Sequence, residues 1–116
     1  MTELEFVGDN LIIKVKGADK LWALKSELTI PLAHIVDATY DPQIAKAWYH
    51  GFKAPGTGIP GVLTAGTFYR HGQKVFWDVH HPDKTIVITL KDESYNQLVI
   101  EVEQPQFELD RISKAR

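Results

Sequence analysis

Apolar and polar residues alternate along most of this chain, and this pattern restricts its fold more than any other feature. Side chains alternate between the two faces of a β-strand, so a period of two predicts strands with one buried face. The chain is therefore expected to be mainly β, with seven or eight short antiparallel strands that form a small barrel or a sandwich. The segments with this pattern are 4–7, 11–16, 28–30, 35–40, 62–70, 74–80, 85–92 and 97–103.

The C-terminal segment 105–116 has a different pattern and is expected to form a helix. Pro105 stands where the first turn would begin, and acidic residues precede basic ones, as the helix dipole favours. Leu109 and Ile112 are three residues apart and could pack on a sheet. With 116 residues, no internal repeat and no linker, the chain is expected to form a single domain over residues 1–116.

The run LKSELTIPLAHIVDA, residues 24–38, resembles the pattern of bacterial pleckstrin-homology-like (PH-like) domains. The resemblance implies a bent antiparallel β-barrel of about seven strands with a C-terminal capping α-helix. It also implies a binding or assembly module without catalysis. Phosphoinositide-binding members of the wider superfamily carry Lys and Arg around the first hairpin. This chain has Gly8-Asp9-Asn10 there, with Glu5 nearby, so lipid binding is not expected.

Composition excludes several classes of function. There is no cysteine, which rules out disulfides and thiolate chemistry and fits a reducing, cytoplasmic location. The 13 Lys and Arg against 15 Asp and Glu give a net charge of -2, so nucleic acid is not an expected partner. No apolar run is long enough for a membrane span. The residues indicate no cofactor and no enzyme, because no serine stands in a nucleophile elbow.

An aromatic cluster lies in the one long connection, residues 41–61. Aromatic side chains with a polar group are favoured at interfaces, because they bury a large area while losing few rotamers. The cluster is therefore a candidate surface for a protein partner or for self-association into a homo-oligomer. It could equally plug one end of a barrel. Its residues are Trp48, Tyr49, His50, Phe52 and Lys53.

The glycines of residues 56–61 match G-x-G-x-x-G, but the match is rejected as a dinucleotide site. That fingerprint requires a strand before it and a helix after it. A long connection precedes these residues, and strand alternation follows them.

The stretch WDVHHPDKT contains two adjacent histidines. Asp78 and His80 share one face of the predicted strand, whereas His81 points to the other face, so the two histidines are not expected to bind one ion together. His81-Pro82-Asp83-Lys84 has the composition of a type I turn. The stretch is therefore expected to be first a hairpin that joins two neighbouring strands.

The alternative function is a small-molecule or metal site, with or without catalysis, around Asp78, His80 and Arg70. Carboxylate and imidazole together can hold a divalent metal when a third group joins them. His71 or His50 could be that group. The usual zinc spacings are absent, so no metal is expected.

Overall fold

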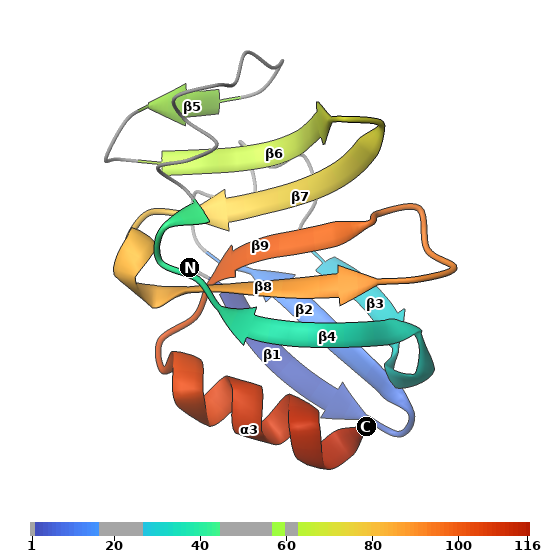
Figure 1. Cartoon of the computed structure of the whole chain (residues 1–116). Helices are drawn as coiled ribbons and strands as arrows, with labels where there is room; N and C mark the ends of the chain where they lie inside the picture. Colours follow the sequence, from blue (N-terminus) through green and yellow to red (C-terminus); the bar gives the residue numbers. More distant parts are fainter. Residues whose placement is uncertain (1, 17–26, 45–56, 60–62) are drawn as a thin grey trace.

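The computed structural model of the chain describes residues 2–16, 27–44, 57–59 and 63–116, and these residues form two sheets and a C-terminal helix (Figure 1). The first sheet has the order β1 (Thr2–Val7), β2 (Asn10–Val15) and β3 (Glu27–Pro31). The second sheet has the order β4 (Ile35–Tyr40), β8 (Thr85–Leu90), β9 (Gln97–Glu101), β7 (Gln73–Val79), β6 (Leu63–Arg70) and β5 (Thr57–Ile59). The helix is α3 (Pro105–Ala115).

The prediction of a mainly β chain with a C-terminal helix is confirmed. The expected closed barrel of about seven strands is not what the described strands form. They make two separate sheets that are not closed into a barrel. Within the part of the chain described, no helix has both the length and the apolar character needed to cross a bilayer.

One pair of strands is parallel, which the expectation of a purely antiparallel protein did not include. β9 pairs with β8 in the antiparallel sense and with β7 in the parallel sense, with Trp77 opposite Val99. β9 thus lies between β7 and β8, although it follows both in the sequence. The connection from β7 to β8 must therefore pass the end of β9.

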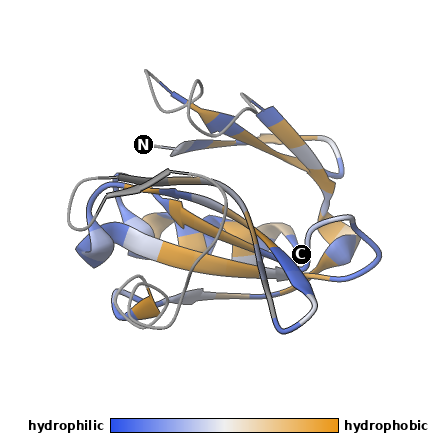
Figure 2. Ribbon diagram, turned by 90° about the horizontal axis from the view of Figure 1, so that it is seen from above, coloured by the Kyte–Doolittle hydropathy of each residue, from blue (hydrophilic) through white to orange (hydrophobic). Residues whose placement is uncertain are grey.

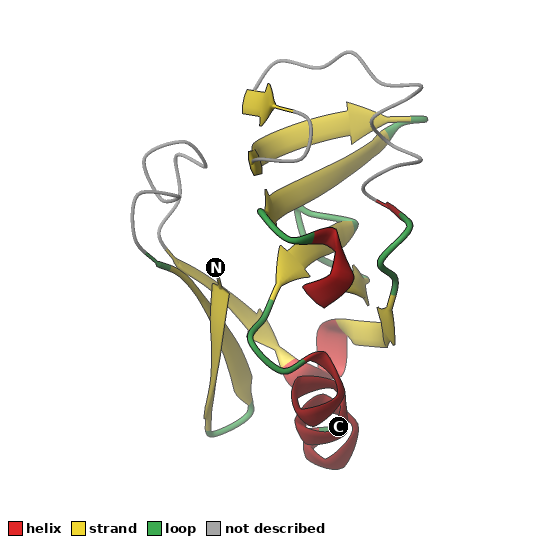
Figure 3. Ribbon diagram, turned by 90° about the vertical axis from the view of Figure 1, so that its left-hand side faces the viewer, coloured by secondary structure: helices red, strands yellow, loops and turns green. Residues whose placement is uncertain are grey.

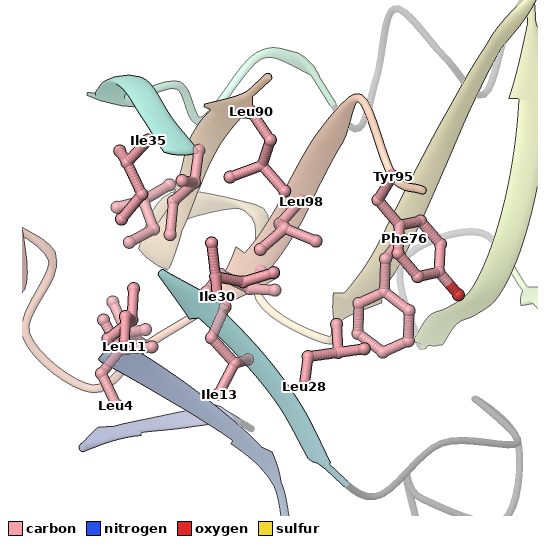
Figure 4. Close-up of a cluster of buried hydrophobic side chains, with 14 of the residues drawn as sticks. Leu4, Leu11, Ile13, Leu28, Ile30, Ile35, Phe76, Leu90, Tyr95 and Leu98 are labelled. Carbon is pink, nitrogen blue, oxygen red and sulfur yellow. The ribbon is translucent and has the colours of Figure 1, made fainter. Parts of the chain in front are cut away.

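The two sheets pack face to face around one apolar cluster (Figures 2 and 4). The alternation of each strand directs one set of side chains into this space, as the sequence predicted. Ile112 of α3 is also fully buried in the cluster, with Leu109 against it. The strand side chains of the cluster include Leu4, Leu11, Ile13, Leu28, Ile30, Phe76, Ile86, Ile88, Leu98 and Ile100.

The far face of the six-stranded sheet is also partly buried. A second cluster contains Phe68, Val75, Trp77, Val79, Val87 and Val99, with Ile44 packed against it. Thr85 and Glu101 point to this side of the sheet and have no exposed surface. Alternation with one buried face would place these two polar side chains on a solvated face, so at these positions the sequence pattern is misleading.

Local signals were read correctly in several places. The segment Gly8–Asp9 turns the chain between β1 and β2, and Gly8 has the positive φ that glycine tolerates. Lys84 N donates to His81 O at 3.0 Å, which is the hydrogen bond of the predicted turn.

Two local expectations were wrong. β7 and β8 do not form a hairpin, because β9 lies between them. Residues 57–59, expected to belong to the long connection, form β5, which pairs with β6.

Candidate functional site

The aromatic cluster of the long connection falls outside the described residues. It remains a prediction, both as a partner surface and as a plug, and its residues are Trp48, Tyr49, His50, Phe52 and Lys53.

The backbone of Arg70 lies far from that of Asp78. In the β6–β7 hairpin Arg70 lies opposite Gln73 beside the turn, whereas Asp78 lies opposite Ala65 near the other end. Asp78 follows Gln73 by five positions along an extended strand, a distance of about 17 Å. The site around Arg70, Asp78 and His80 stays a prediction.

Asp78 belongs to the contact between the two sheets. Its side chain is 0 % exposed, and the Thr2 hydroxyl donates to Asp78 Oδ2 over 2.6 Å. Thr2 starts β1 and Asp78 lies near the end of β7, so this hydrogen bond joins the three-stranded sheet to the six-stranded sheet. A buried carboxylate needs such donors, and this contact gives Asp78 a structural role.

The adjacent histidines are anchored by Glu101, which the sequence analysis had not singled out. The backbone N–H groups of His80 and His81 donate to Glu101 Oε1 at 2.6 and 2.8 Å. His81 Nδ1 lies 2.8 Å from Glu101 Oε2. Burial alone would raise the pKa of the Glu101 carboxyl, but these hydrogen bonds outweigh burial and hold the pKa below its ordinary value of 4.5.

Glu101 therefore fixes the connection that passes the end of β9. Val102 N also donates to Lys84 O at 3.1 Å, which ties the far end of this connection to the residue after β9. Among the described residues no group of three or more histidine, cysteine or acidic side chains is placed to hold a metal ion. The cluster is thus best understood as an anchor for the chain crossing.

The ribbon of α3 runs beside β1 (Figures 1 and 3). A groove of about 380 Å³ lies between residues of the two elements. Three consecutive strand residues, Thr2, Glu3 and Leu4, line one wall. Consecutive side chains of a strand point to opposite faces of the sheet. A groove that contacts three consecutive residues must therefore run along the edge of the strand, where both faces meet. The opposite wall consists of the first turns of α3 and the two residues before the helix. Its residues are Glu103, Gln104, Phe107, Glu108 and Arg111.

Among the strands that the structure describes, β1 is the outer strand of its sheet and pairs with β2 alone. Its other edge, which borders this groove, is left open by these strands. An outer strand presents unpaired N–H and C=O groups along its free side. The groove therefore combines main-chain donors and acceptors with a helical wall.

Phe107 and Arg111 are the α3 residues of this wall that solvent reaches, because Glu108 is buried. Phe107 is 57 % exposed, although it is a large apolar side chain. The Arg111 guanidinium lies 4.6 Å from the centre of the Phe6 ring and 5.5 Å from that of Phe107. Arg111 Nη1 also donates to Glu108 Oε1 over 2.7 Å. These contacts hold the guanidinium in place and leave the Phe107 ring accessible.

A second hollow of about 580 Å³ lies beside the β1–β2 turn, near the end of α3. The chain itself uses polar groups around it. Leu32 N donates to Asp9 O at 2.8 Å, and Arg116 Nη2 donates to Val36 O at 2.7 Å. Outer strands reach this hollow only through single end residues, Pro31 of β3 and Ile35 of β4. Three consecutive residues of β1 line the β1–α3 groove, so that groove is the stronger candidate.

The sequence contained one signal for the groove that was not used. Phe107 lies outside the buried side of the helix, which Leu109 and Ile112 define. An exposed aromatic residue on an amphipathic helix is a candidate contact residue. That β1 is an outer strand, and that α3 lies beside it, depends on strand order and could not be read locally.

Comparison of the chain with protein-family models, with curated proteins and with solved structures gives no match.

Proposed function

We propose that this chain is a non-catalytic module that binds a protein partner, and that the β1–α3 groove receives an extended segment of that partner. The observation that carries the proposal is the open edge of β1 along a groove whose other wall is a helix. An extended peptide that joins a sheet edge gains main-chain hydrogen bonds, and its alternate side chains reach the walls of the groove.

The exposed Phe107 ring supports a partner of this kind. Aromatic side chains are enriched among the residues that dominate binding energy, because they bury a large area and lose little rotamer entropy. Phe107 stands beside the open edge, where the apolar side chain of an added strand would contact it. The contacts of Arg111 with both Phe6 and Phe107 keep this wall ordered before binding, which lowers the entropic cost.

The resemblance to PH-like domains agrees with a binding role in the cytoplasm. The parallel β7–β9 pair and the two open sheets depart from the antiparallel barrel that this resemblance implies. The proposal therefore rests on the groove, and the PH-like relationship is a separate hypothesis. The cluster Trp48–Lys53 remains a candidate for a second contact surface.

Selection from a library of random heptapeptides displayed on phage tests the proposal. Enriched peptides are synthesised, and their binding to the chain is compared with binding to Phe107→Glu. Tyr69→Glu is the matched control, because Tyr69 is a 61 % exposed aromatic residue of β6, outside the groove lining. We expect Phe107→Glu to weaken binding at least about tenfold, equivalent to about 1.4 kcal/mol, and Tyr69→Glu to have little effect.

N-methylation of the peptide backbone tests strand addition directly. An N-methyl group removes one hydrogen-bond donor, and alternate residues of an added strand point their N–H groups toward the sheet edge. Methylation at one set of alternate positions should abolish binding, and methylation at the other set should be tolerated. Peptides that bind wild type and Phe107→Glu equally well would place the contact surface elsewhere and refute the proposal.

A further inference from the structure

We infer that the segment bound in the β1–α3 groove is cationic, with Lys or Arg alternating with apolar residues. This inference rests on the proposed function and specifies its partner. The charges that line the groove carry it. They are the carboxylates of Glu3, Glu103 and Glu108 and the guanidinium of Arg111.

The positive charge of the groove is already neutralised. Arg111 is bonded to Glu108 at 2.7 Å, and its guanidinium lies over the Phe6 ring. These two partners satisfy the charge of Arg111 and occupy Glu108. Two carboxylates, those of Glu3 and Glu103, are left to set the charge that a bound segment meets.

Glu3 and Glu103 are held only loosely by lysines of the chain. Lys16 Nζ lies 3.6 Å from Glu3 Oε2, and Lys84 Nζ lies 3.7 Å from Glu103 Oε1. The two glutamate side chains are 66 % and 72 % exposed. Exposed pairs of this kind contribute about 0–1 kcal/mol each. A carboxylate accepts several donors, so a partner's cation can bind without displacing these lysines.

A second copy of the chain fits the same edge poorly. If β1 paired with β1 of another copy with the buried faces together, Glu3 and Glu5 would face the glutamates of the other strand. Like charges opposite each other destabilise a strand pair. Shifting the strands by one residue would instead set the core-facing Leu4 opposite a glutamate. Charge therefore favours a cationic partner over self-association at this edge.

The alternation of an added strand fixes the pattern of the bound segment. Side chains of the segment that continue the Glu3 side of the sheet meet the Glu3 carboxylate, and those that continue the Leu4 side meet Phe107 on the helical wall. A basic residue at every second position, with apolar residues between, satisfies both walls.

The heptapeptides selected on the wild-type chain provide the probe. Their affinity for the wild type is compared by fluorescence anisotropy with that for Glu3→Gln/Glu103→Gln. Glu27→Gln/Asp110→Asn is the matched control, because it changes the net charge equally with exposed residues outside the groove lining. We expect about tenfold weaker binding to the groove variant and less than about twofold to the control, with a smaller salt dependence in the groove variant.

The outcomes separate this inference from the proposed function. Enriched peptides that depend on Phe107 but show no excess of Lys and Arg would refute the cationic partner and leave strand addition standing. Equal weakening by both charge variants would show a long-range effect of net charge and would also refute the inference. The absence of any peptide that depends on Phe107 would refute both. A dimer that Phe107→Glu dissociates would identify a second copy as the occupant.

Discussion

Buried polar side chains show how individual residues hold this fold. Glu101 and Asp78 are carboxylates without exposed surface, and both accept hydrogen bonds from other strands or connections. Thr85 is buried as well, but its hydroxyl has no hydrogen-bond partner among the described residues. Sequence patterns predict burial from polarity, so these three residues are among those that such patterns place on the wrong side.

Glu101 makes stability depend on pH. Its pKa in the folded protein lies below the ordinary value of 4.5, because the donors of His80 and His81 favour the charged form. The unfolded chain therefore binds a proton more readily than the folded chain. The stabilisation is complete above the ordinary pKa and is lost as the pH falls through the lowered pKa of the folded state.

We expect Glu101→Gln to lower the free energy of unfolding at pH 7 by about 2 kcal/mol, because hydrogen bonds to a charged group are lost. The variant should also lose less stability between pH 5 and pH 3 than the wild type, a window of roughly two units around the ordinary value. Urea unfolding at several pH values measures both effects. Glu103→Gln is the control, because the side chain of Glu103 is 72 % exposed. Parallel pH profiles for Glu101→Gln and the wild type would contradict this role.

At the scale of elements, most strands and the helix could be predicted from the sequence. Alternation located β4 at residues 35–40, and the proline and charge pattern located α3. These signals are local, because they depend on which face of one element is buried. Asp41 Oδ1 accepts hydrogen bonds from the backbone N–H groups of Gln43 and Ile44 at 3.1 Å, a local contact of the same kind.

Strand order could not be predicted in the same way. The position of β9 between β7 and β8 depends on partners distant in sequence, and alternation is identical for a strand at the centre or at the edge of a sheet. For this reason the parallel pair, the buried second face and the open edge of β1 were all missed. The candidate groove was missed with them, because it consists of an edge and a helix that only the folded chain brings together.

The two sides of α3 should respond differently to truncation. Ile112 is fully buried in the main cluster, so Ile112→Ala should lower the free energy of unfolding by about 2–5 kcal/mol. Phe107 is mostly exposed, and its ring contact with Arg111 is an exposed one. Phe107→Ala should therefore cost less than about 1 kcal/mol. Thermal and urea unfolding of the two variants measure this difference.

A large loss of stability in Phe107→Ala would mean that this side chain is needed for the fold. In that case its exposure would no longer indicate a contact surface. The two substitutions can be compared directly, because Phe107 and Ile112 lie in the same eleven-residue helix.

At the scale of the whole molecule, the two sheets depend on each other. The inner face of β1–β3 consists of side chains such as Leu11, Ile13 and Ile30, which are buried in the cluster shared with the larger sheet (Figure 4). A three-stranded sheet cannot keep such a face in water, since exposed apolar surface costs about 25 cal/mol per Å². We therefore expect both sheets to unfold in one transition.

The hydrogen bond from Thr2 to Asp78 is the polar contact that tests this dependence. Thr2→Val keeps the shape of the side chain but removes the donor, and it leaves the buried carboxylate with one bond fewer. We expect a loss of about 1–3 kcal/mol in the free energy of unfolding. Thr29→Val, at an exposed site on β3, should change it by less than about 0.5 kcal/mol.

Hydrogen exchange shows whether Thr2→Val destabilises both sheets or only the three-stranded sheet. If the sheets form one cooperative unit, Thr2→Val should lower the protection of the slowest amides in β2 and in β9 by the same free energy, although Thr2 belongs to the smaller sheet. Loss of protection in β1 and β2 alone would show that the three-stranded sheet opens by itself. The groove beside β1 would then lie on a separable part of the molecule, and binding of a peptide there should protect β1 and β2 without protecting β9.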